Sequence, residues 1–405
     1  EHALRNSTES EELPPPIRKM SPALRPPRCL LLAPLAAAHF VLAAAGGGTS
    51  FLSQRRGRGG LGLGAASALQ HDDGGQQSMK HLYPWYHTGS EIGGAARKLA
   101  AECGALSVRT VSQDGVSVDV ASVKAKDSNP TNKVFILFGE HSRELISPET
   151  GLYLLRVLCG SAESDSTRSA AEILRDSEFQ MVLNGNPRSR KEVEHGSFCT
   201  RMNPNGVDLN RNWDEKWKSS GRMESNPGPY PFSEPETRIF RQLVSDYGPT
   251  TFLTVHSGTR GLYMPWAYDK EHLATRNQEA MLQILRDVDR KHCQCPFGAA
   301  GREVGYSCPG TCLDWAYDKL KTPYSFAFEI YTSPMMDVQL RSRWQDKLAS
   351  GGASLLEAGN HLGHEHFRDL FGRHGSDFVH TRGGSGAGWS AEGDCFGTFN
   401  PDTHE

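Results

Sequence analysis

The chain has 405 residues, with 44 Lys and Arg residues against 47 Asp and Glu residues, and a formal net charge of −3. This length allows a large domain with a sizeable buried core, and the near-neutral charge lacks the basic excess typical of nucleic-acid-binding proteins. No stretch reaches the ~18–20 consecutive apolar residues of a transmembrane helix. We therefore expect neither a nucleic-acid partner nor a stable membrane span.

The first 45 residues are expected to direct the chain to a compartment rather than to fold. Met20 is a plausible start, and it is followed by arginines and then by an apolar run that ends in small residues. This pattern is typical of a secretory signal peptide and predicts a secreted protein or one in the endomembrane lumen. Two alternatives remain open: a short signal anchor, and an organelle transit peptide, which the absence of acidic residues between 13 and 71 would suit.

The composition changes twice after this segment. Residues 46–82 are rich in Gly, Ser, Ala and Arg without a sustained period, so we expect a disordered linker. From residue 83 to residue 405 the composition is that of one globular domain. We expect this domain to be a monomer.

Short apolar or alternating runs in this domain predict buried strands, and amphipathic stretches between them predict helices. The expected strands cover 116–123, 134–138, 179–183, 252–255 and 324–330. The expected helices cover 93–102, 148–158, 170–176, 234–247 and 272–290. Strands that alternate with helices predict a single α/β domain. We expect a mixed, mostly parallel twisted central sheet with helices on both faces.

Cysteine usage agrees with secretion. Of nine Cys residues, Cys29 lies in the predicted signal and eight remain, an even number that favours disulfides. Four of these lie close together in the sequence, namely Cys293, Cys295, Cys308 and Cys312. A structural zinc site is the alternative for this group, although a Cys-x-Cys spacing fits zinc poorly. The connectivity stays open.

Polar residues with metal-binding chemistry stand where three predicted strands end. His141 and Glu144 follow the strand over 134–138, His256 closes the next, and Glu329 closes the last. Each alone has a simpler explanation as a hydrogen-bonded polar residue. Together they offer three ligands and one free carboxylate, the set that a zinc hydrolase needs.

The segment over 203–213 is dense in side chains that bind anions and backbone groups. Asn210 and Arg211 stand side by side in it, and such a pair can bind a carboxylate. The alternative is a structural turn held by Asn and Asp side chains.

These motifs carry a family resemblance. The segments 139–144, 208–213, 253–257 and 324–329 read Gly-Glu-His-Ser-Arg-Glu, Asp-Leu-Asn-Arg-Asn-Trp, Leu-Thr-Val-His-Ser and Tyr-Ser-Phe-Ala-Phe-Glu. In order and spacing they resemble the zinc metallocarboxypeptidases of the funnelin type, the carboxypeptidase A/B-like proteins. The tail over 395–401 is most similar to a plant and protist branch of that family.

The resemblance implies a catalytic centre with one Zn²⁺ ion per chain. His141, Glu144 and His256 would be its ligands. Glu329 would be the general base, and Arg190, chosen over Arg188, would stabilise the oxyanion of the reaction.

The resemblance also implies how a substrate would bind. Asn210 and Arg211 would bind the free C-terminal carboxylate of a peptide or protein, and Tyr306 would close over it. Leu313 would lie at the base of the pocket for the terminal side chain. A Leu offers no counter-charge, so apolar or aromatic C-terminal residues should be preferred.

Two further roles and two departures complete the comparison. Asp208 resembles the carboxylate that orients the first His ligand, and Arg143 resembles an outer-subsite arginine. The segment over 46–82 is too short for a folded inhibitory pro-domain. The chain stops at Glu405, where relatives usually close with a helix, so we expect C-terminal truncation.

Other functions on the same scaffold remain open. One is a catalytically inactive peptide-binding protein, and another is a zinc amidohydrolase or deglutamylase. Zinc content together with the release of single C-terminal amino acids would separate these alternatives.

Overall fold

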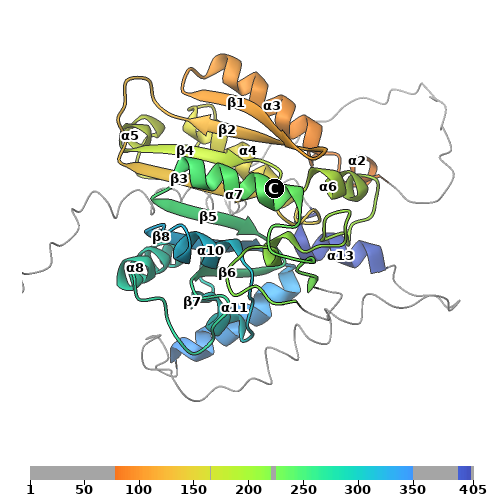
Figure 1. Ribbon diagram of the computed structural model, residues 1–405, viewed down its shortest axis with the longest axis vertical. Coiled ribbons are helices and arrows are strands. Elements are labelled where there is room, and N and C mark those ends of the chain that lie inside the picture. The colour runs from red at the N-terminus through yellow and green to blue at the C-terminus, as the bar shows by residue number, and fades with distance from the viewer. Residues whose placement is uncertain (1–77, 165, 220–224, 350–390, 403–405) are drawn as a thin grey trace, which may run out of the picture.

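A computed structural model describes residues 78–164, 166–219, 225–349 and 391–402 (Figure 1). The predicted signal segment and almost all of the predicted linker lie outside these residues. The linker was expected to extend to residue 82, but α2 (Met79–Leu82) is helical and its Met79 is fully buried. Met79 packs with Tyr86 and Phe396, so the folded domain begins before the predicted boundary.

The domain is built on one eight-stranded mixed sheet, in the order β1-β2-β4-β3-β5-β8-β6-β7. The strands are β1 (Leu106–Gln113), β2 (Val116–Val123), β3 (Asn132–Phe138), β4 (Ser177–Val182), β5 (Thr251–His256), β6 (Thr259–Met264), β7 (Phe297–Ala299) and β8 (Tyr324–Tyr331). The neighbours β4, β3, β5 and β8 are parallel, whereas β1, β2 and β6 join the sheet by antiparallel pairs. The predicted α/β class and mostly parallel sheet are confirmed.

Helices cover both faces of the sheet (Figure 1). One face packs against α3 (Gly89–Glu102), α4 (Ile146–Leu158), α5 (Ala170–Asp176) and α8 (Gln278–Val288), and the other against α7 (Pro235–Tyr247) and α10 (Cys312–Asp318). The remaining helices are α6 (Pro187–Glu194), η1 (Leu209–Arg211), η3 (Asp289–Cys293), α9 (Ala300–Val304), α11 (Pro334–Ala349) and α13 (Ala391–Phe399). No helix in the described part of the chain is long and apolar enough to cross a membrane.

Strand β3 illustrates why the sheet is buried on both sides. Ile136 and Phe138 belong to the core beneath α3 and α4, and Phe135 and Leu137 belong to the core beneath α7. All four are fully buried. Alternate residues of a strand face opposite sides, so an uninterrupted apolar run supplies both cores at once.

Three disulfides form among the described cysteines: Cys103–Cys159, Cys199–Cys395 and Cys293–Cys295. The expectation that all eight remaining cysteines pair is wrong for Cys308 and Cys312, which are buried free thiols. Their thiols lie in different cores: Cys312 packs with the core beneath α10, and Cys308 packs in a separate small cluster. The alternative of a four-cysteine zinc site also fails, because Cys293 and Cys295 bond to each other.

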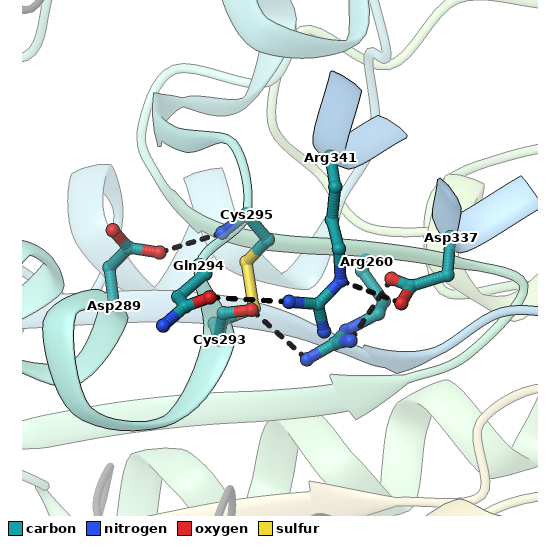
Figure 2. The surroundings of a disulfide bond; sticks show 7 residues. All are labelled: Arg260, Asp289, Cys293, Gln294, Cys295, Asp337 and Arg341. Carbon is teal, nitrogen blue, oxygen red and sulfur yellow. Dashed lines mark hydrogen bonds and ion pairs between the residues drawn. A yellow bond between two sulfur atoms is a disulfide. The ribbon is translucent and has the colours of Figure 1, made fainter. Parts of the chain in front are cut away.

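The Cys293–Cys295 disulfide lies where α11 docks onto β6 (Figure 2). Arg260 of β6 donates to the Cys293 carbonyl oxygen at 3.1 Å and forms an ion pair with Asp337 of α11 at 3.0 Å. Arg341 of α11 contacts the same Asp337 at 2.7 Å. The short disulfide loop therefore presents a backbone acceptor to the charged network that holds α11 (Figure 2).

Candidate active site

The carboxyl ends of β3 and β5 bring His141, Glu144 and His256 together. His141 Nδ1 lies 2.7 Å from Glu144 Oε1, and His256 Nδ1 lies 3.0 Å from Glu144 Oε2. The two Nδ1 atoms are 3.1 Å apart, and all three side chains are buried. Parallel neighbouring strands end at the same edge of a sheet, which is where open α/β sheets bind ligands.

The turn that carries His141 requires a glycine. Gly139 has φ +68°, and a Cβ atom there would come within 2.9 Å of the Pro148 side chain. Only a residue without a side chain can adopt this conformation at such close range without strain. Gly139 thus lets the chain leave β3 and turn at once toward the site.

Hydrogen bonds orient both imidazoles toward one point. His141 Nε2 lies 3.2 Å from Asp208 Oδ1, and His256 Nε2 lies 2.8 Å from Thr254 Oγ1. With both Nε2 atoms bonded in this way, the two Nδ1 atoms are the ones that face Glu144 and could bind a metal together with it. This donor set, with Asp208 behind one histidine, fits a zinc ion.

The charge state of Glu144 supports the same interpretation. Burial acts to raise the pKa of this carboxyl, but His141 and His256 hold the pKa well below its usual range. Glu144 is therefore ionised and available to a cation. The cluster of His141, Glu144 and His256 is one of two groups in the described residues whose geometry could hold a metal. The other contains Cys293 and Cys295, whose sulfur atoms form a disulfide.

Glu329 lies beside this cluster on β8, directly across from His256 in the parallel β5–β8 pairing. Its Oε2 atom is buried and makes no hydrogen bond within the described part of the chain. Burial raises the pKa of Glu329, and the charge on Glu144 acts in the same direction, while His256 opposes both. Glu329 is thus a carboxyl with an uncommitted oxygen and an unusually high proton affinity.

A second buried glutamate was not anticipated from the sequence. Glu140 is fully buried, and its Oε1 accepts a hydrogen bond from Trp213 Nε1 at 3.1 Å. Its Oε2 accepts from the Cys312 thiol at 3.6 Å and lies 3.6 Å from His256 Nε2. The available signal was a charged residue between a buried strand and His141. Burial raises the pKa of Glu140, while the neighbouring His256 and His141 oppose that shift.

Arg190 does not reach this cluster, so its predicted place in the site is wrong. It is buried on α6, where its guanidinium pairs with Glu194 at 3.2 Å and donates to the His87 carbonyl oxygen at 2.7 Å. Helix α6 starts directly after β4 and carries Arg190 into the protein, toward the segment before α3. None of these contacts involves a candidate metal ligand.

Arg201, rather than Arg190, contacts the candidate metal ligands. Its Nη1 lies 3.1 Å from His141 Nδ1 and 3.6 Å from Glu144 Oε1, and its Nε donates to Asp208 at 3.1 Å. The side chain is 22% exposed, so it borders both the buried cluster and the solvent. The signal in the sequence was its position shortly before Asp208, in the segment that also carries Asn210.

The residues expected to bind a substrate carboxylate are Asn210, Arg211 and Tyr306. Asn210 Nδ2 is 3.4 Å from His256 Nε2, and Asn210 Oδ1 accepts from the Cys312 backbone N–H at 3.0 Å. Arg211 follows in η1 and its Nη1 donates to the Asn210 carbonyl oxygen at 2.7 Å. Tyr306 lies on the loop between α9 and α10 and is 51% exposed. A side chain this exposed has room to move.

Leu313 is buried in a small apolar cluster at the start of α10. The cluster also contains Tyr263, Ala267, Ala300 and Cys308. Next to Leu313, the Asp314 carboxylate accepts hydrogen bonds from the backbone N–H groups of Ala267 and Tyr268 at 2.9 Å. These bonds fix α10 against the loop after β6, so Leu313 keeps its place among apolar side chains.

Arg143 lies between the two ligands of the first motif and the C-terminal segment. Its guanidinium carbon is 3.9 Å from the centroid of the Phe399 ring. Burial lowers the pKa of Arg143 to about 10, and the neighbouring Arg201 contributes to that shift. Its expected contact with a substrate stays a prediction.

A His-Glu-His cluster at the carboxyl edge of an α/β sheet, with a further glutamate beside it, is an arrangement suited to zinc-dependent hydrolases. A profile of the zinc carboxypeptidase family matches residues 96–350. This chain belongs to the zinc carboxypeptidase family.

Individual relatives are distant. The chain is 28% identical over 222 residues to carboxypeptidase A5 of Macaca fascicularis, covering 49% of this chain and 48% of the relative. It is 27% identical over 271 residues to carboxypeptidase A1 of Bos taurus, covering 61% of this chain and 63% of the relative. The alignments thus span about half to three fifths of these curated relatives.

Solved structures show the same fold. Thrombin-activatable fibrinolysis inhibitor matches with a TM-score of 0.52 and 23% identity, over 60% of this chain and 66% of that chain. Carboxypeptidase A of Helicoverpa armigera matches with a TM-score of 0.51 and 18% identity, over 66% of this chain and 74% of that chain. At these identities the likeness concerns the fold alone.

Proposed function

We propose that this chain is a zinc-dependent carboxypeptidase that hydrolyses the C-terminal peptide bond of peptides or proteins. The observation that carries the proposal is the convergence of His141, Glu144 and His256 next to Glu329, whose Oε2 atom is buried without a hydrogen bond. Three ligands leave one zinc position open, and the adjacent carboxyl has the proton affinity that a general base requires.

Each residue of the site has a distinct task in this reaction. When bound, zinc supplies a positive charge that polarises a carbonyl group and lowers the pKa of water to about 7. His141, Glu144 and His256 hold the ion. Glu329 takes the proton of the attacking water and gives it to the leaving amine, and its raised pKa suits both transfers. Arg201 stabilises the negative charge that develops on the carbonyl oxygen.

The preference for a chain end follows from the charged groups beside the metal centre. We propose that Asn210 and Arg211 bind the terminal carboxylate and that Tyr306 closes over it. A peptide bond inside a chain would leave these donors without an acceptor, a cost that disfavours internal cleavage.

We further propose that apolar or aromatic terminal residues are preferred. Leu313 packs with Ala300 and Cys308, and none of these three side chains carries a charge that could compensate a buried Lys or Arg. An apolar side chain would instead gain about 25 cal/mol for each Å² removed from water.

The test is metal analysis combined with a peptide panel. Purified protein is assayed for zinc and for release of single residues from matched peptides ending in Phe, Leu, Lys or Glu. Stoichiometric zinc with preferential release of Phe or Leu is the expected result. A preference for Lys or Glu would overturn the role of Leu313 while leaving the carboxypeptidase activity intact.

The same preparation separates the other candidate functions. Zinc without any release of amino acids would identify a peptide-binding protein. Release of acyl groups from acyl-amino acids, or of side-chain glutamates, without release of C-terminal residues would identify an amidohydrolase or deglutamylase.

We also propose that the protein matures in an oxidising compartment, as a monomer. The three disulfides support this location, because such bonds are rare in reducing compartments. Mass spectrometry of the secreted protein should find an N-terminus beyond residue 45 and two free thiols, on Cys308 and Cys312. Retention of residues 1–45 would point to a signal anchor, and analytical ultracentrifugation would test the oligomeric state.

A further inference from the structure

The C-terminal segment over 395–401 lies against the loop that carries Glu144 and against the loop that directly follows His256. Asn400 Oδ1 accepts from the Ile146 backbone N–H at 3.1 Å, and Asn400 Nδ2 donates to the Arg143 carbonyl oxygen at 2.9 Å. One side chain therefore binds the backbone on both sides of Glu144. The Asn400 side chain is itself buried, with 1% of the residue exposed.

Phe399, which precedes Asn400, contacts the loop after His256. The Phe399 carbonyl oxygen accepts a hydrogen bond from Ser257 Oγ at 2.7 Å, and Ser257 directly follows His256. The Phe399 ring fits closely here, since a Cβ atom on Gly258 would lie 2.3 Å from it. Phe399 and Asn400 thus connect the loop of Glu144 to the loop that follows His256.

The segment is itself anchored firmly. The Cys199–Cys395 disulfide joins it to the stretch that leads to Arg201. Phe396 is fully buried and stacks on Tyr83, with ring centroids 3.4 Å apart. The disulfide and the stacked Phe396 together hold the segment in a fixed position, so it can support the residues that it contacts.

We infer that Asn400 and Phe399 are positioning residues of the metal centre, an inference that rests on the zinc site proposed above. Glu144 lies in the loop between β3 and α4, whereas His256 is the last residue of β5 and is followed by the short loop of Ser257 and Gly258. Contacts outside the ligand set must therefore hold the two loops at the separation that zinc requires. The bonds from Asn400 and Phe399 supply such contacts to both loops at once.

The experiment measures zinc affinity by competition with a chelator, using the full chain and its Asn400→Ala and Asn132→Ala variants. Asn132 is a matched control, because it is also buried and its side chain also bonds a backbone carbonyl, that of Asp176 at 2.9 Å. It stands at the start of β3, whereas His141 and Glu144 follow the end of that strand and His256 ends β5. The zinc affinity of Asn400→Ala should fall about tenfold or more, as for other losses behind metal ligands.

The outcomes are distinct. A loss of zinc affinity in Asn400→Ala but not in Asn132→Ala supports the inference. Equal losses in both variants would show a general loss of stability, and no loss in either would show that the bonds do not matter; both results overturn the inference. A parent protein that binds no zinc would overturn the proposed function as well.

A milder variant covers the case in which Asn400→Ala does not fold. Ser257→Ala removes only the hydroxyl that bonds the Phe399 carbonyl oxygen. Its zinc affinity should fall about fivefold, the equivalent of one hydrogen bond. Unchanged affinity in the folded Ser257→Ala protein would contradict the inference by itself.

Discussion

Glu329 differs from the other acidic side chains around the candidate metal centre in what its oxygens contact. Glu140 is bonded to Trp213, Asp208 to His141 and Arg201, and Glu144 to both histidines. Glu329 keeps one buried oxygen without a partner. A buried acceptor costs free energy when it is left unpaired, so its persistence beside a cluster of ligands points to a task in chemistry rather than in folding.

Glu329→Gln should lose activity and keep its metal. The amide preserves the shape of the side chain but cannot accept a proton, so turnover should fall by a factor of about 10²–10⁴. The measurement is kcat on the preferred peptide, with zinc content determined on the same sample. Glu279→Gln is a suitable control, since that side chain is 73% exposed on α8. Activity above a tenth of the parent value would place the general base elsewhere.

Replacing each of the two arginines, Arg201 and Arg190, by Met tests which one stabilises the oxyanion. Arg201→Met should lower kcat by about 10²–10³, the usual loss for one oxyanion donor. Arg190→Met should keep kcat and lower the free energy of unfolding by a few kcal/mol, because it removes the ion pair with Glu194 and leaves the partly buried His87 carbonyl without this donor. Peptide kinetics and denaturant unfolding on both variants decide the matter. The reverse pattern would restore Arg190 to the site.

The elements of the central sheet were predictable where the sequence pattern was strong. The strand expected over 116–123 and the helix expected over 170–176 have the observed bounds. Strands β1, β6 and β7 were missed. β6 is interrupted by Gly261, and β7 has only three residues, so neither shows a sustained apolar or alternating pattern. Both lie at one edge of the sheet, where pairing with a neighbour rather than local preference decides the structure.

The connection between the segment before α3 and helix α4 should depend on pH. His87 Nδ1 lies 2.8 Å from Glu149 Oε2 on α4, and this bond raises the pKa of His87, while burial opposes the shift. A raised pKa in the folded state means that the stabilisation is complete below the unfolded pKa of about 6.5 and is lost as the pH rises through the folded value.

His87→Gln should therefore lower the free energy of unfolding by about 0.5–1 kcal/mol at mildly acidic pH and by less in alkaline buffer. Denaturant unfolding at two pH values, one on each side of the transition, measures the difference. His272→Gln serves as the control. The His272 side chain is 77% exposed, so its pair with Asp269 should contribute little to the free energy of unfolding at either pH. A pH-independent effect of His87→Gln would argue against the ion pair.

At the scale of the whole molecule, the metal centre joins parts of the chain that are far apart in sequence. Its candidate ligands come from β3 and β5, its candidate base comes from β8, and the C-terminal segment supports two of the loops. A ligand that binds only the folded protein stabilises all of these parts together.

Removal of zinc should accordingly lower the thermal midpoint of the domain as a single unit. At zinc concentrations about a thousand times the dissociation constant, bound metal contributes about 4 kcal/mol, which corresponds to roughly 10 °C. Calorimetry before and after treatment with a chelator measures the shift, and added zinc should restore the original midpoint. An unchanged midpoint would mean that the His-Glu-His cluster does not bind zinc appreciably.

The sequence by itself determined the fold class, the positions of five strands along the chain, and the motif residues at the strand ends. These features depend on local signals: apolar runs that must be buried, and polar side chains placed immediately after them. His141, Glu144, His256 and Glu329 could be proposed because each stands next to such a run.

Only the tertiary structure decided which more distant residues join them. Arg201 and Arg190 are both arginines in loops or short helices after β4, and nothing local to either tells which side of the sheet it reaches. The choice between them depends on how α6 packs and on the bond of Arg201 to Asp208. The free thiols of Cys308 and Cys312 and the contact of Asn400 with the loop of Glu144 are likewise products of packing between segments far apart in the chain. Such contacts form because the folded core brings those segments together, so their partners cannot be read from the residues alongside them.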